Sequence, residues 1–410
     1  MFEVYKFKVS AVIGANFGDE GKGLVADWLA SKSDNAIVVL HNGGPQRAHT
    51  VTTPEGREHI FRHIGAGTFV GAATYIAKSF ICNPMIFKEE YEKLMPKLFN
   101  RPKIYIDKRC KFTTFYDMII NQAREIECGV AKHGSCGLGI YETICRYRDK
   151  EFVFQQEVIS PYGISIDEFA ALSYLGKYNY LKSLKKYYTE KRIDQTKIHK
   201  MPVELEKALE SEVAIQNYIS DFEFMMKKCA LVDNPDFLRS YDDVIFENGQ
   251  GLLLDQDNME YYPHLTLSHT GLYNINEILK ECYFTGYINA YYVSRTYMTR
   301  HGAGRFDTEC EKKDINFFMW DRTNVPNMFQ DTLRYGALDY KELAARIASE
   351  SKKSDHPVTT SLVLTHLNEY GRRGEYRKLA ADGVYISDNY TRNSVRSAPY
   401  MLQFENHKKL

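Results

Sequence analysis

A glycine-rich loop near the N-terminus constrains this chain more than any other feature of its sequence. Residues 14–23 have the sequence Gly-Ala-Asn-Phe-Gly-Asp-Glu-Gly-Lys-Gly. They follow an apolar run, Val9–Gly14, that is expected to form a strand, and they precede an expected helix, Leu24–Ser31. A second expected strand, Ala36–Leu40, comes next. This β-α-β order favours a parallel sheet with covering helices.

Later apolar runs extend this prediction. Four of them could supply further strands: Lys103–Ile106, Val244–Glu247, Gly286–Tyr292 and Val358–Leu364. Residues 164–225 are rich in Leu, Lys, Tyr and Glu with few glycines, which predicts a helical insertion. We therefore expect a single α/β domain over residues 1–410. It has a central, mainly parallel β-sheet with surrounding helices, helical insertions and a P-loop-like nucleotide site.

Composition excludes several classes of protein. The 53 Lys and Arg residues balance 53 Asp and Glu residues, whereas a nucleic-acid coat or a binder of anionic membranes needs a basic excess. No export signal and no apolar run long enough to span a bilayer is found, so a cytoplasmic protein is expected. Its eight cysteines are scattered without a Cys-x-x-Cys pair, which indicates free thiols in a reducing compartment.

The glycine-rich loop has the features of a phosphate-binding site. Its glycines let backbone N–H groups approach a phosphate, the following helix adds its positive end, and Lys22 adds a point charge. It is not a Walker A loop, because Asn16 and Gly23 replace the first glycine and the magnesium-binding hydroxyl.

Two acidic residues inside this loop are unusual. A carboxylate beside phosphates is repelled unless a cation lies between them or the carboxylate has a chemical task of its own. Asp19 is therefore interpreted as a Mg²⁺ ligand, a general base, or both. For Glu20, we expect a simpler role in the first helical turn, where it complements the helix dipole.

A second polar loop, His41–Val51, follows the second expected strand. A parallel sheet brings both loops to the same edge, where ligands of open α/β sheets bind. This position makes His49 a candidate for catalysis, although an isolated histidine is more often structural.

Seven segments, in chain order, resemble the adenylosuccinate synthetase family. Its first loop contains G-D-E-G-K-G, and its second has a Gly-Gly segment followed by A-G-H-T. Later family motifs include F-E-G-A-Q-G-x-L-L-D and T-R-x-G-A-G-x-x-x-T-E. The matching segments here are Gly18–Gly23, Gly43–Val51, Ala77–Pro84, Gly134–Ile140, Phe246–Asp255, Tyr262–Thr266 and Thr299–Glu309.

The resemblance implies a two-step ligase reaction. A γ-phosphoryl group moves to O6 of a purine 5′-monophosphate such as IMP, and the amine of L-aspartate then displaces phosphate at C6. Asp19 would take the N1 proton and bind Mg²⁺, His49 would stabilise charge at O6, and the carbonyl of Ala48 would be a further metal ligand. The implied nucleoside triphosphate site consists of Gly18, Gly21, Lys22, Gly23, Thr50, Asn368 and Ser387.

The other implied substrate sites depart from the family pattern. For the purine monophosphate the matching positions are Gln46, Ser135, Cys136, Arg146, Gln250 and Thr266. Arg148 is an alternative to Arg146 as the arginine that crosses the interface of a homodimer. The family's arginine-rich aspartate loop is absent here, so we expect Arg300 and Arg322, with Thr323, to bind aspartate. Arg305 and Arg334 are the other candidates.

The largest departure from the family pattern is in the segment that recognises the base of the triphosphate. The family recognises guanine with the Asp of a T-K-L-D segment, whereas this chain has Thr365-His366-Leu367-Asn368. A neutral amide suits the N6 and N1 edge of adenine, so the hypothesis is that guanine selectivity is lost and ATP is the phosphoryl donor, with GTP as the open alternative.

Two alternative functions stay open. One is the reaction of phage enzymes that resemble this family and convert dGMP, with ATP, toward a 2-aminoadenine nucleotide. We expect those enzymes to have a small residue in place of the base, so Asp19 favours IMP. The other is a catalytically inactive nucleotide-binding relative, which would not need Asp19, Lys22, His49 and Gln250 together.

Overall fold

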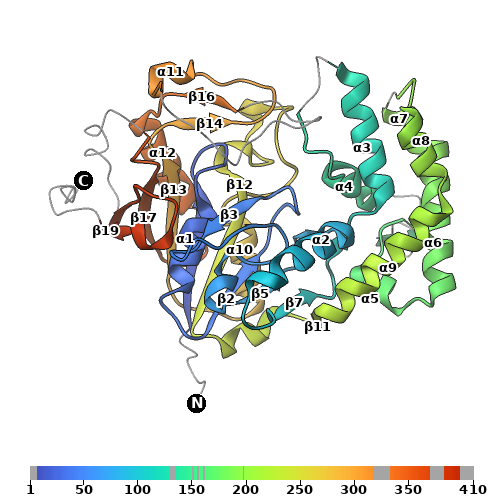
Figure 1. The fold of residues 1–410 in the computed structure, drawn as a ribbon, viewed down its shortest axis with the longest axis horizontal. Coiled ribbons are helices and arrows are strands. Elements are labelled where there is room, and N and C mark those ends of the chain that lie inside the picture. The colour runs from blue at the N-terminus through green and yellow to red at the C-terminus, as the bar shows by residue number, and fades with distance from the viewer. Residues whose placement is uncertain are drawn as a thin grey trace.

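A ten-stranded sheet forms the centre of the molecule (Figure 1). The computed structural model describes residues 7–129, 134–149, 152–154, 157–159, 162–196, 198–317, 333–369 and 383–397. Along the sheet the strands follow the order β11-β7-β5-β2-β12-β1-β13-β17-β18-β19. Neighbouring strands are parallel, apart from β18 and β19, which are antiparallel. The predicted α/β fold with a mainly parallel sheet is confirmed.

The six strands expected from the sequence all belong to this sheet. They are β1 (Lys8–Gly14), β2 (Ala36–Leu40), β7 (Ile104–Asp107), β12 (Asp243–Gly251), β13 (Ile288–Arg295) and β17 (Val358–Thr365). The sheet is completed by β5 (Ala73–Ile76), β11 (Ala230–Val232), β18 (Gly383–Ile386) and β19 (Arg396–Ser397). The smaller sheets pair β3 (His49–Thr52) with β4 (Glu58–Phe61), β6 (Ile81–Cys82) with β8 (Lys111–Phe112), β9 (Phe152–Phe154) with β10 (Glu157–Ile159), and β16 (Arg334–Gly336) with β14 (Met298–Arg300) and β15 (Glu309–Cys310).

Both faces of the sheet are covered because its strands are apolar on both sides. Val12, Val38 and Leu40 pack in one core with helix α1 (Lys22–Ala30). On the opposite face, Ile37 and Val39 pack with α10 (Tyr273–Glu281) and α12 (Tyr340–Ser351). The alternation along β2 therefore places successive side chains in different cores.

The region between β8 and β11 is largely helical and lies to one side of the sheet, at the right of Figure 1. The predicted helical segment 164–225 contains helices α5 to α9, with the last helix ending at Lys228. Within the described residues, no helix has the length and apolar character required to cross a membrane. The helices of this region are α3 (Phe115–Cys128), α4 (Ile140–Arg148), α5 (Ile166–Ala171), α6 (Tyr174–Tyr187), α7 (Ile193–Thr196), α8 (Val203–Glu210) and α9 (Glu212–Lys228). Elsewhere in the chain, α2 (Pro84–Leu94) precedes β7, and α11 (Lys312–Ile315) follows β15.

The connections of the sheet change direction at its centre. From β1 the chain adds β2, β5, β7 and β11 toward one edge, and later adds β13, β17 and β18 toward the other. Strand β12 is inserted between β2 and β1. Loops at the carboxyl ends of strands diverge at such a switch point, and a crevice opens between them.

Candidate active site

A cavity of about 990 Å³ lies at the carboxyl ends of the central strands. It is lined by the loops after β1, β2, β12, β13 and β17, together with the β3–β4 hairpin, α3 and the loop before α4. This volume is at the upper end of the range for small-molecule sites. Most of the expected site residues line it: Gly18, Asp19, Gly21, Lys22, Gly23, Gln46, Ala48, His49, Thr50, Ser135, Cys136, Gln250, Thr266, Arg300 and Asn368.

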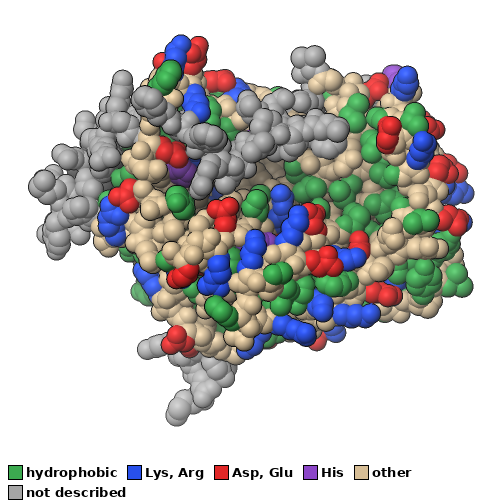
Figure 2. Space-filling model, viewed as in Figure 1, with side chains coloured by type: hydrophobic (Ala, Val, Ile, Leu, Met, Phe, Trp, Pro, Cys, Tyr) green, Lys and Arg blue, Asp and Glu red, His purple; other side chains and the backbone are tan. Residues whose placement is uncertain are grey.

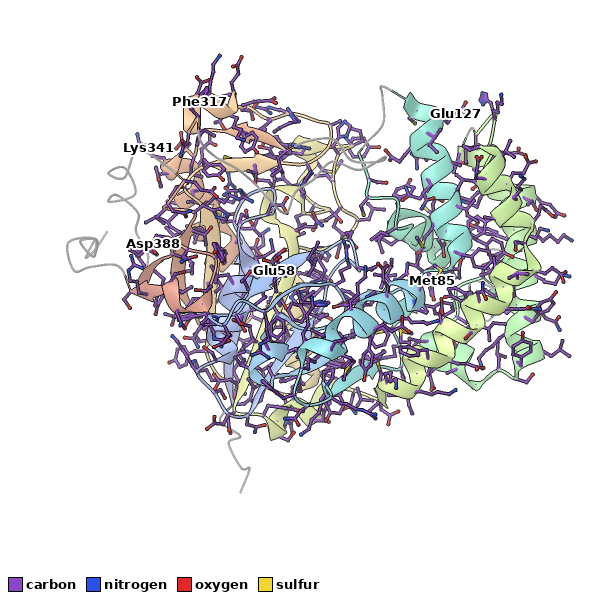
Figure 3. All side chains as sticks on the ribbon, in the orientation of Figure 1. Glu58, Met85, Glu127, Phe317, Lys341 and Asp388 are labelled. Carbon is purple, nitrogen blue, oxygen red and sulfur yellow. The ribbon has the colours of Figure 1, made fainter. Side chains whose placement is uncertain are left out.

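The cavity lies between the sheet and the helical region. Figure 2 shows Lys and Arg side chains near the centre of this face, between the two parts. Glu58, labelled in Figure 3, belongs to the β3–β4 hairpin that lines the cavity. Seven Lys and Arg residues line it against five Asp and Glu residues, a modest cationic excess that suits anionic substrates.

The first loop is folded around a buried ion pair. Nζ of Lys22 lies 3.4 Å from Oε2 of Glu20, and both side chains are 2 % exposed. Oε1 of Glu20 accepts a hydrogen bond of 2.5 Å from the backbone N–H of Asn16. Burial raises the pKa of Glu20, and the charge of Lys22 opposes this shift. The expected position of Glu20 in the first helical turn is wrong, because α1 begins only at Lys22 and the Glu20 side chain is buried.

Gly14 provides the space for this ion pair. A Cβ atom there would lie 2.2 Å from Oε2 of Glu20 and 2.7 Å from the backbone oxygen of Gln250. Neither distance is possible without movement, so only glycine fits where β1 enters the loop.

Asp19 lies in a half-buried part of the same loop. Its φ of 59° is in the left-handed region, which disfavours residues other than glycine, and Arg295 Nε donates a 2.5 Å hydrogen bond to its backbone oxygen. The side chain is 33 % exposed, and its Oδ2 lies 3.4 Å from Nε2 of His301. The fold therefore holds the Asp19 backbone in a strained conformation and leaves its carboxylate accessible from the cavity.

Strained backbone gathers around this cavity. Of the four non-glycine residues with positive φ in the described chain, Asp19, Gln250 and His366 line it. The register between β1 and β12 shifts between Val12 and Gly14, and Gln250 lies in this irregular part of β12. Such strain is typical of functional sites, where surrounding structure compensates for its energy.

His49 is held from inside the protein by a carboxylate. Nδ1 of His49 lies 2.5 Å from Oε1 of Glu247, which comes from β12. Nη2 of Arg47 also lies 2.5 Å from this Oε1, and Oε2 accepts a hydrogen bond from the backbone N–H of Ala66. Glu247 is fully buried, while the side chain of His49 is 10 % exposed and lines the cavity.

Burial and these contacts shift the pKa of both groups. Burial alone would raise the pKa of Glu247, but Arg47 and His49 lower it to about 2. Burial and Arg47 lower the pKa of His49 to about 4. Nδ1 of His49 lies 2.5 Å from Oε1 of Glu247 and 2.9 Å from Nη2 of Arg47, so it can carry the hydrogen toward the carboxylate or accept one from Arg47, depending on the ring tautomer. Bound phosphates would favour the imidazolium form, which can donate from Nε2.

The expected purine monophosphate residues lie together, with one exception. Gln46, Ser135, Cys136, Gln250 and Thr266 line the cavity. Ser135 Oγ is hydrogen-bonded to Asn121, and burial raises the pKa of the Cys136 thiol.

Arg146 is the exception. It is fully buried, forms an ion pair of 3.1 Å with Asp117, and donates to the backbone oxygens of Phe112 and Tyr162. It cannot cross a dimer interface from this position, so its assignment to the monophosphate site is wrong. The alternative, Arg148, lines the cavity.

Of the four arginines considered for aspartate, Arg300 lines the cavity. It is 1 % exposed, and its guanidinium lies 4.5 Å from the centroid of the Phe17 ring. Burial and the nearby Arg334 lower its pKa to about 10, so it keeps its charge at neutral pH. Arg305 and Arg334 form ion pairs with Asp307 and Glu309, outside the lining. Arg322 and Thr323 lie outside the described residues.

The segments expected to recognise the base of the triphosphate differ in placement. Asn368 lines the cavity together with His366. Ser387 is fully buried, and its hydroxyl contacts Ser394 Oγ at 2.6 Å and the backbone oxygen of Asn389 at 2.8 Å. The Ser387 side chain therefore does not reach the cavity, and Asn389 and Tyr390 line it instead.

The expected metal ligands fit a magnesium ion. Asp19 supplies an accessible carboxylate. Ala48 is exposed, and because its side chain has no ligand atom, it can bind a metal only through its backbone oxygen. Both residues line the same cavity. Mg²⁺ prefers hard oxygen ligands and keeps several waters, so few protein ligands are required. The two donors are therefore chemically suited to this ion.

Sequence reasoning missed three residues of the site: Glu247, Arg295 and His301. Glu247 lies within the Phe246–Asp255 motif, but nothing local links it to a histidine that precedes it by 198 positions. Arg295 precedes the Thr299–Glu309 motif and His301 lies within it, and their proximity to Asp19 depends on the pairing of β1 with β13.

Comparisons with known proteins agree with this architecture. Residues 11–369 match the adenylosuccinate synthetase family. Adenylosuccinate synthetases from Parabacteroides distasonis and Coxiella burnetii are 29% and 28% identical over 315 and 313 residues. These alignments cover 74% of this chain and 66% and 65% of the relatives, so the chain spans about two thirds of their length. The chain belongs to the adenylosuccinate synthetase family.

Two solved structures share the fold. The fully ligated adenylosuccinate synthetase from Plasmodium falciparum matches with a TM-score of 0.65 and 20% identity, over 88% of this chain and 77% of that one. The succinoaminodeoxyadenylate synthetase of cyanophage S-2L, bound to dGMP and to dATP as an energy donor, matches with a TM-score of 0.60 and 13% identity. That match covers 97% of both chains.

Proposed function

We propose that this protein joins L-aspartate to C6 of a purine 5′-monophosphate, IMP in the first place, with hydrolysis of a nucleoside triphosphate. The observation that carries this proposal is the position of Asp19 and His49 in one cavity with a glycine-rich loop and Lys22. A simple nucleotide-binding protein has no need for two proton-transfer groups next to its phosphate loop.

In the first step, the Asp19 carboxylate takes the proton from N1 of the purine, and O6 attacks the γ-phosphorus of the triphosphate. The diphosphate leaves, and the base carries a 6-phosphoryl group. His49 in its imidazolium form donates from Nε2 to the negative charge that develops near O6. Lys22 and the loop N–H groups hold the phosphates.

In the second step, the amine of aspartate attacks C6 and inorganic phosphate leaves with the original O6. The guanidinium of Arg300 binds a carboxylate of aspartate. Its buried position on the cavity wall supports this role, because the contact would be shielded from water. The residues proposed for the monophosphate, Gln46, Ser135, Cys136, Gln250 and Thr266, line the cavity, and Arg148 stays the candidate for the arginine that a second subunit would contribute.

Magnesium belongs to the proposal, with Asp19 and the backbone oxygen of Ala48 as its protein ligands. When bound, the ion would neutralise charge on the phosphates. A homodimer and a cytoplasmic location remain predictions.

A product assay tests this function. The enzyme is offered IMP, dIMP, GMP or dGMP with aspartate, Mg²⁺ and either ATP or GTP, and products are identified by mass spectrometry. The proposal predicts an aspartate adduct of IMP. Nucleotide binding without any adduct would instead support the inactive relative.

A second candidate is the conversion of dGMP with ATP. Asn368 on the cavity wall favours an adenine donor, and the cyanophage enzyme with the same fold binds dGMP and dATP. Asp19 argues for IMP, since the 2-amino group of dGMP needs room beside the base. An adduct of dGMP alone in the product assay would establish this alternative.

The donor is tested separately by initial rates with ATP and GTP at equal concentration. We expect ATP to be preferred, and Asn368→Asp to shift the preference toward GTP, because a carboxylate accepts from N1–H and the 2-amino group of guanine. A clear GTP preference of the unmodified enzyme would contradict an adenine-specific site.

A further inference from the structure

Arg62 is a cation of the cavity wall that lacks a carboxylate partner within the described part of the chain. It directly follows β4, and its half-buried side chain lines the cavity. Two other cations of the wall are neutralised, Lys22 by Glu20 and Arg47 by Glu247. No ion pair among the described residues includes Arg62. Its charge is therefore available to an anionic ligand.

The alternation of β4 directs this side chain toward the cavity. Phe61 is buried in the core, whereas Ile60 lines the cavity. Successive side chains of a strand point to opposite faces, so Arg62 shares the face of Ile60. Glu90 accepts a hydrogen bond from the backbone N–H of Arg62, a contact that does not use the guanidinium. The hairpin therefore presents the guanidinium itself to a ligand.

The guanidinium lies near two segments that are expected to hold the purine monophosphate. Its Nη1 donates a hydrogen bond of 2.7 Å to the backbone oxygen of Pro45, the residue before Gln46. Burial raises the pKa of the Cys136 thiol, and a backbone hydrogen bond and the nearby charge of Arg62 oppose this rise. Arg62 is thus close both to the turn that contains Gln46 and to the loop that contains Cys136.

The same turn and loop lie against each other. A Cβ atom on Gly44 would lie 2.6 Å from Cδ1 of Ile140, the first residue of α4. No side chain caps the start of this helix, so the N–H groups of its first turn can also bind an anion. A phosphate on this side of the cavity would meet neutral donors together with the positive charge of Arg62.

We propose that Arg62 binds the 5′-phosphate of the purine monophosphate and so supplies a positive charge from the same subunit. This inference rests on the proposed function. With Nη1 held by Pro45, the edge formed by Nε and Nη2 has no hydrogen-bond partner within the described residues. Such an edge matches a phosphate with two parallel hydrogen bonds. Position 62 lies outside the seven segments that resemble the family, so the resemblance assigns it no role.

The test compares ligands with and without the phosphate. Calorimetry measures the Kd of IMP and of inosine for the unmodified enzyme and for Arg62→Gln, which keeps a donor but removes the charge. The Kd of IMP should rise by about 10- to 100-fold, as expected for a lost hydrogen bond to a charged group. The Kd of inosine should stay within about twofold. The pair dGMP and deoxyguanosine is measured in the same way.

Arg62→Lys keeps the charge but not the paired donors, so it should recover only part of the affinity for IMP. If Arg62→Gln does not fold, this variant decides, because it should still lose about three- to tenfold for IMP and nothing for inosine. Steady-state kinetics should show a higher KM for the monophosphate, with kcat and the KM values for aspartate and the triphosphate within about threefold.

Arg57→Gln is the matched control. Arg57 belongs to the turn of the same hairpin and also donates to a backbone oxygen, that of Lys97, at 3.1 Å. It lies outside the cavity lining. The Kd of IMP for this variant should stay within about twofold of that for the unmodified enzyme.

Three results would overturn the proposal: an unchanged Kd of IMP in Arg62→Gln, equal losses of affinity for IMP and inosine, or a higher KM for the triphosphate or aspartate alone. Equal losses would mean that Arg62 shapes the cavity without contacting the phosphate. Phosphate-dependent binding of IMP through Arg62 without any aspartate adduct would refute the proposed function and leave this assignment in place. Absence of binding of either monophosphate would refute both.

Discussion

The carboxylate of Glu247 and the imidazole of His49 lie 2.5 Å apart, although 198 residues separate them in the chain. The contact joins the middle of β12 to the start of β3. Strand β3 follows β2 in the chain, and β2 pairs in parallel with β12. The contact of Glu247 with His49 fixes the ring nitrogen that faces the protein interior and leaves the other nitrogen for the cavity.

The first prediction concerns this contact. Glu247→Gln leaves the buried Arg47 without its counterion, so the free energy of unfolding should fall by about 3–5 kcal/mol, and kcat should fall by about 10- to 100-fold. Urea unfolding and steady-state kinetics measure both effects. Glu90→Gln is the control: Glu90 is a buried carboxylate that accepts from the N–H groups of Arg62, His63 and Ile64. The Glu90→Gln variant should have a lower free energy of unfolding but an unchanged kcat. Equal losses of kcat in the Glu90→Gln and Glu247→Gln variants would contradict a specific role for Glu247.

The second prediction concerns the proposed base. Asp19→Asn removes the proton acceptor but keeps the shape of the side chain, and Asn tolerates the left-handed backbone at this position. We expect turnover to fall at least about 10²-fold, the lower end of the range for general base catalysis. Affinity for the monophosphate, measured by calorimetry without metal, should remain within a few-fold. An unchanged kcat would remove Asp19 from the mechanism.

The third prediction concerns the space around the first loop. Gly14→Ala places a methyl group against Glu20 and the backbone of Gln250, so the free energy of unfolding should fall by about 1–3 kcal/mol. Gly249→Ala is a matched control on the neighbouring strand, because a Cβ there would meet its nearest atoms at 3.6 Å. Urea unfolding midpoints should separate the two variants. Equal midpoints would show that the loop adjusts freely around position 14.

The fourth prediction concerns the stability of the protein in acid. Burial lowers the pKa of His41, His49 and His59 to about 4, below the ordinary value of 6.5, and raises that of Asp27 to about 6. Between pH 6 and pH 4 the unfolded chain therefore binds about three more protons on the histidines and one fewer on Asp27. The free energy of unfolding should fall as the pH falls, by about 3 kcal/mol per pH unit for a net two protons.

His59→Phe tests the origin of this dependence. His59 is buried, its Nε2 has no hydrogen-bond partner within the described residues, and its ring contacts Phe61 edge-on. The variant should reduce the slope by about one proton, or 1.4 kcal/mol per pH unit. Urea unfolding at pH 5, 6 and 7 measures the slope, and an unaltered slope would exclude His59 as one of its sources.

Local patterns predicted six strands of the central sheet and the helix after the first loop, because each of these elements has its own signal in the sequence. A continuous apolar run marks β2, and the glycine-rich loop between an apolar run and a helix marks the start of the site. The prediction that the loops 14–23 and 41–51 meet at one edge of the sheet required only that the sheet is parallel. These inferences require only short stretches of chain and the rule that parallel strands present their carboxyl ends together.

Pairing between distant residues was not predictable in this way. The burial of Arg146 depends on Asp117 and on two backbone oxygens from other segments, and the role of Glu20 depends on the missing side chain of Gly14. In both cases a charged side chain that could bind a ligand instead forms an ion pair inside the protein, Arg146 with Asp117 and Glu20 with Lys22. The sequence contains no local signal that distinguishes a charged residue that binds a ligand from one that pairs with another residue of the chain.

The most direct test of the account follows the oxygen of the purine. Monophosphate labelled with ¹⁸O at position 6 is converted with aspartate, Mg²⁺ and unlabelled triphosphate, and the inorganic phosphate is analysed by mass spectrometry. Because O6 attacks the γ-phosphorus and later leaves with it, the account predicts one ¹⁸O atom in each phosphate formed. Unlabelled phosphate alongside an aspartate adduct would contradict the 6-phosphoryl mechanism and, with it, the role assigned to Asp19.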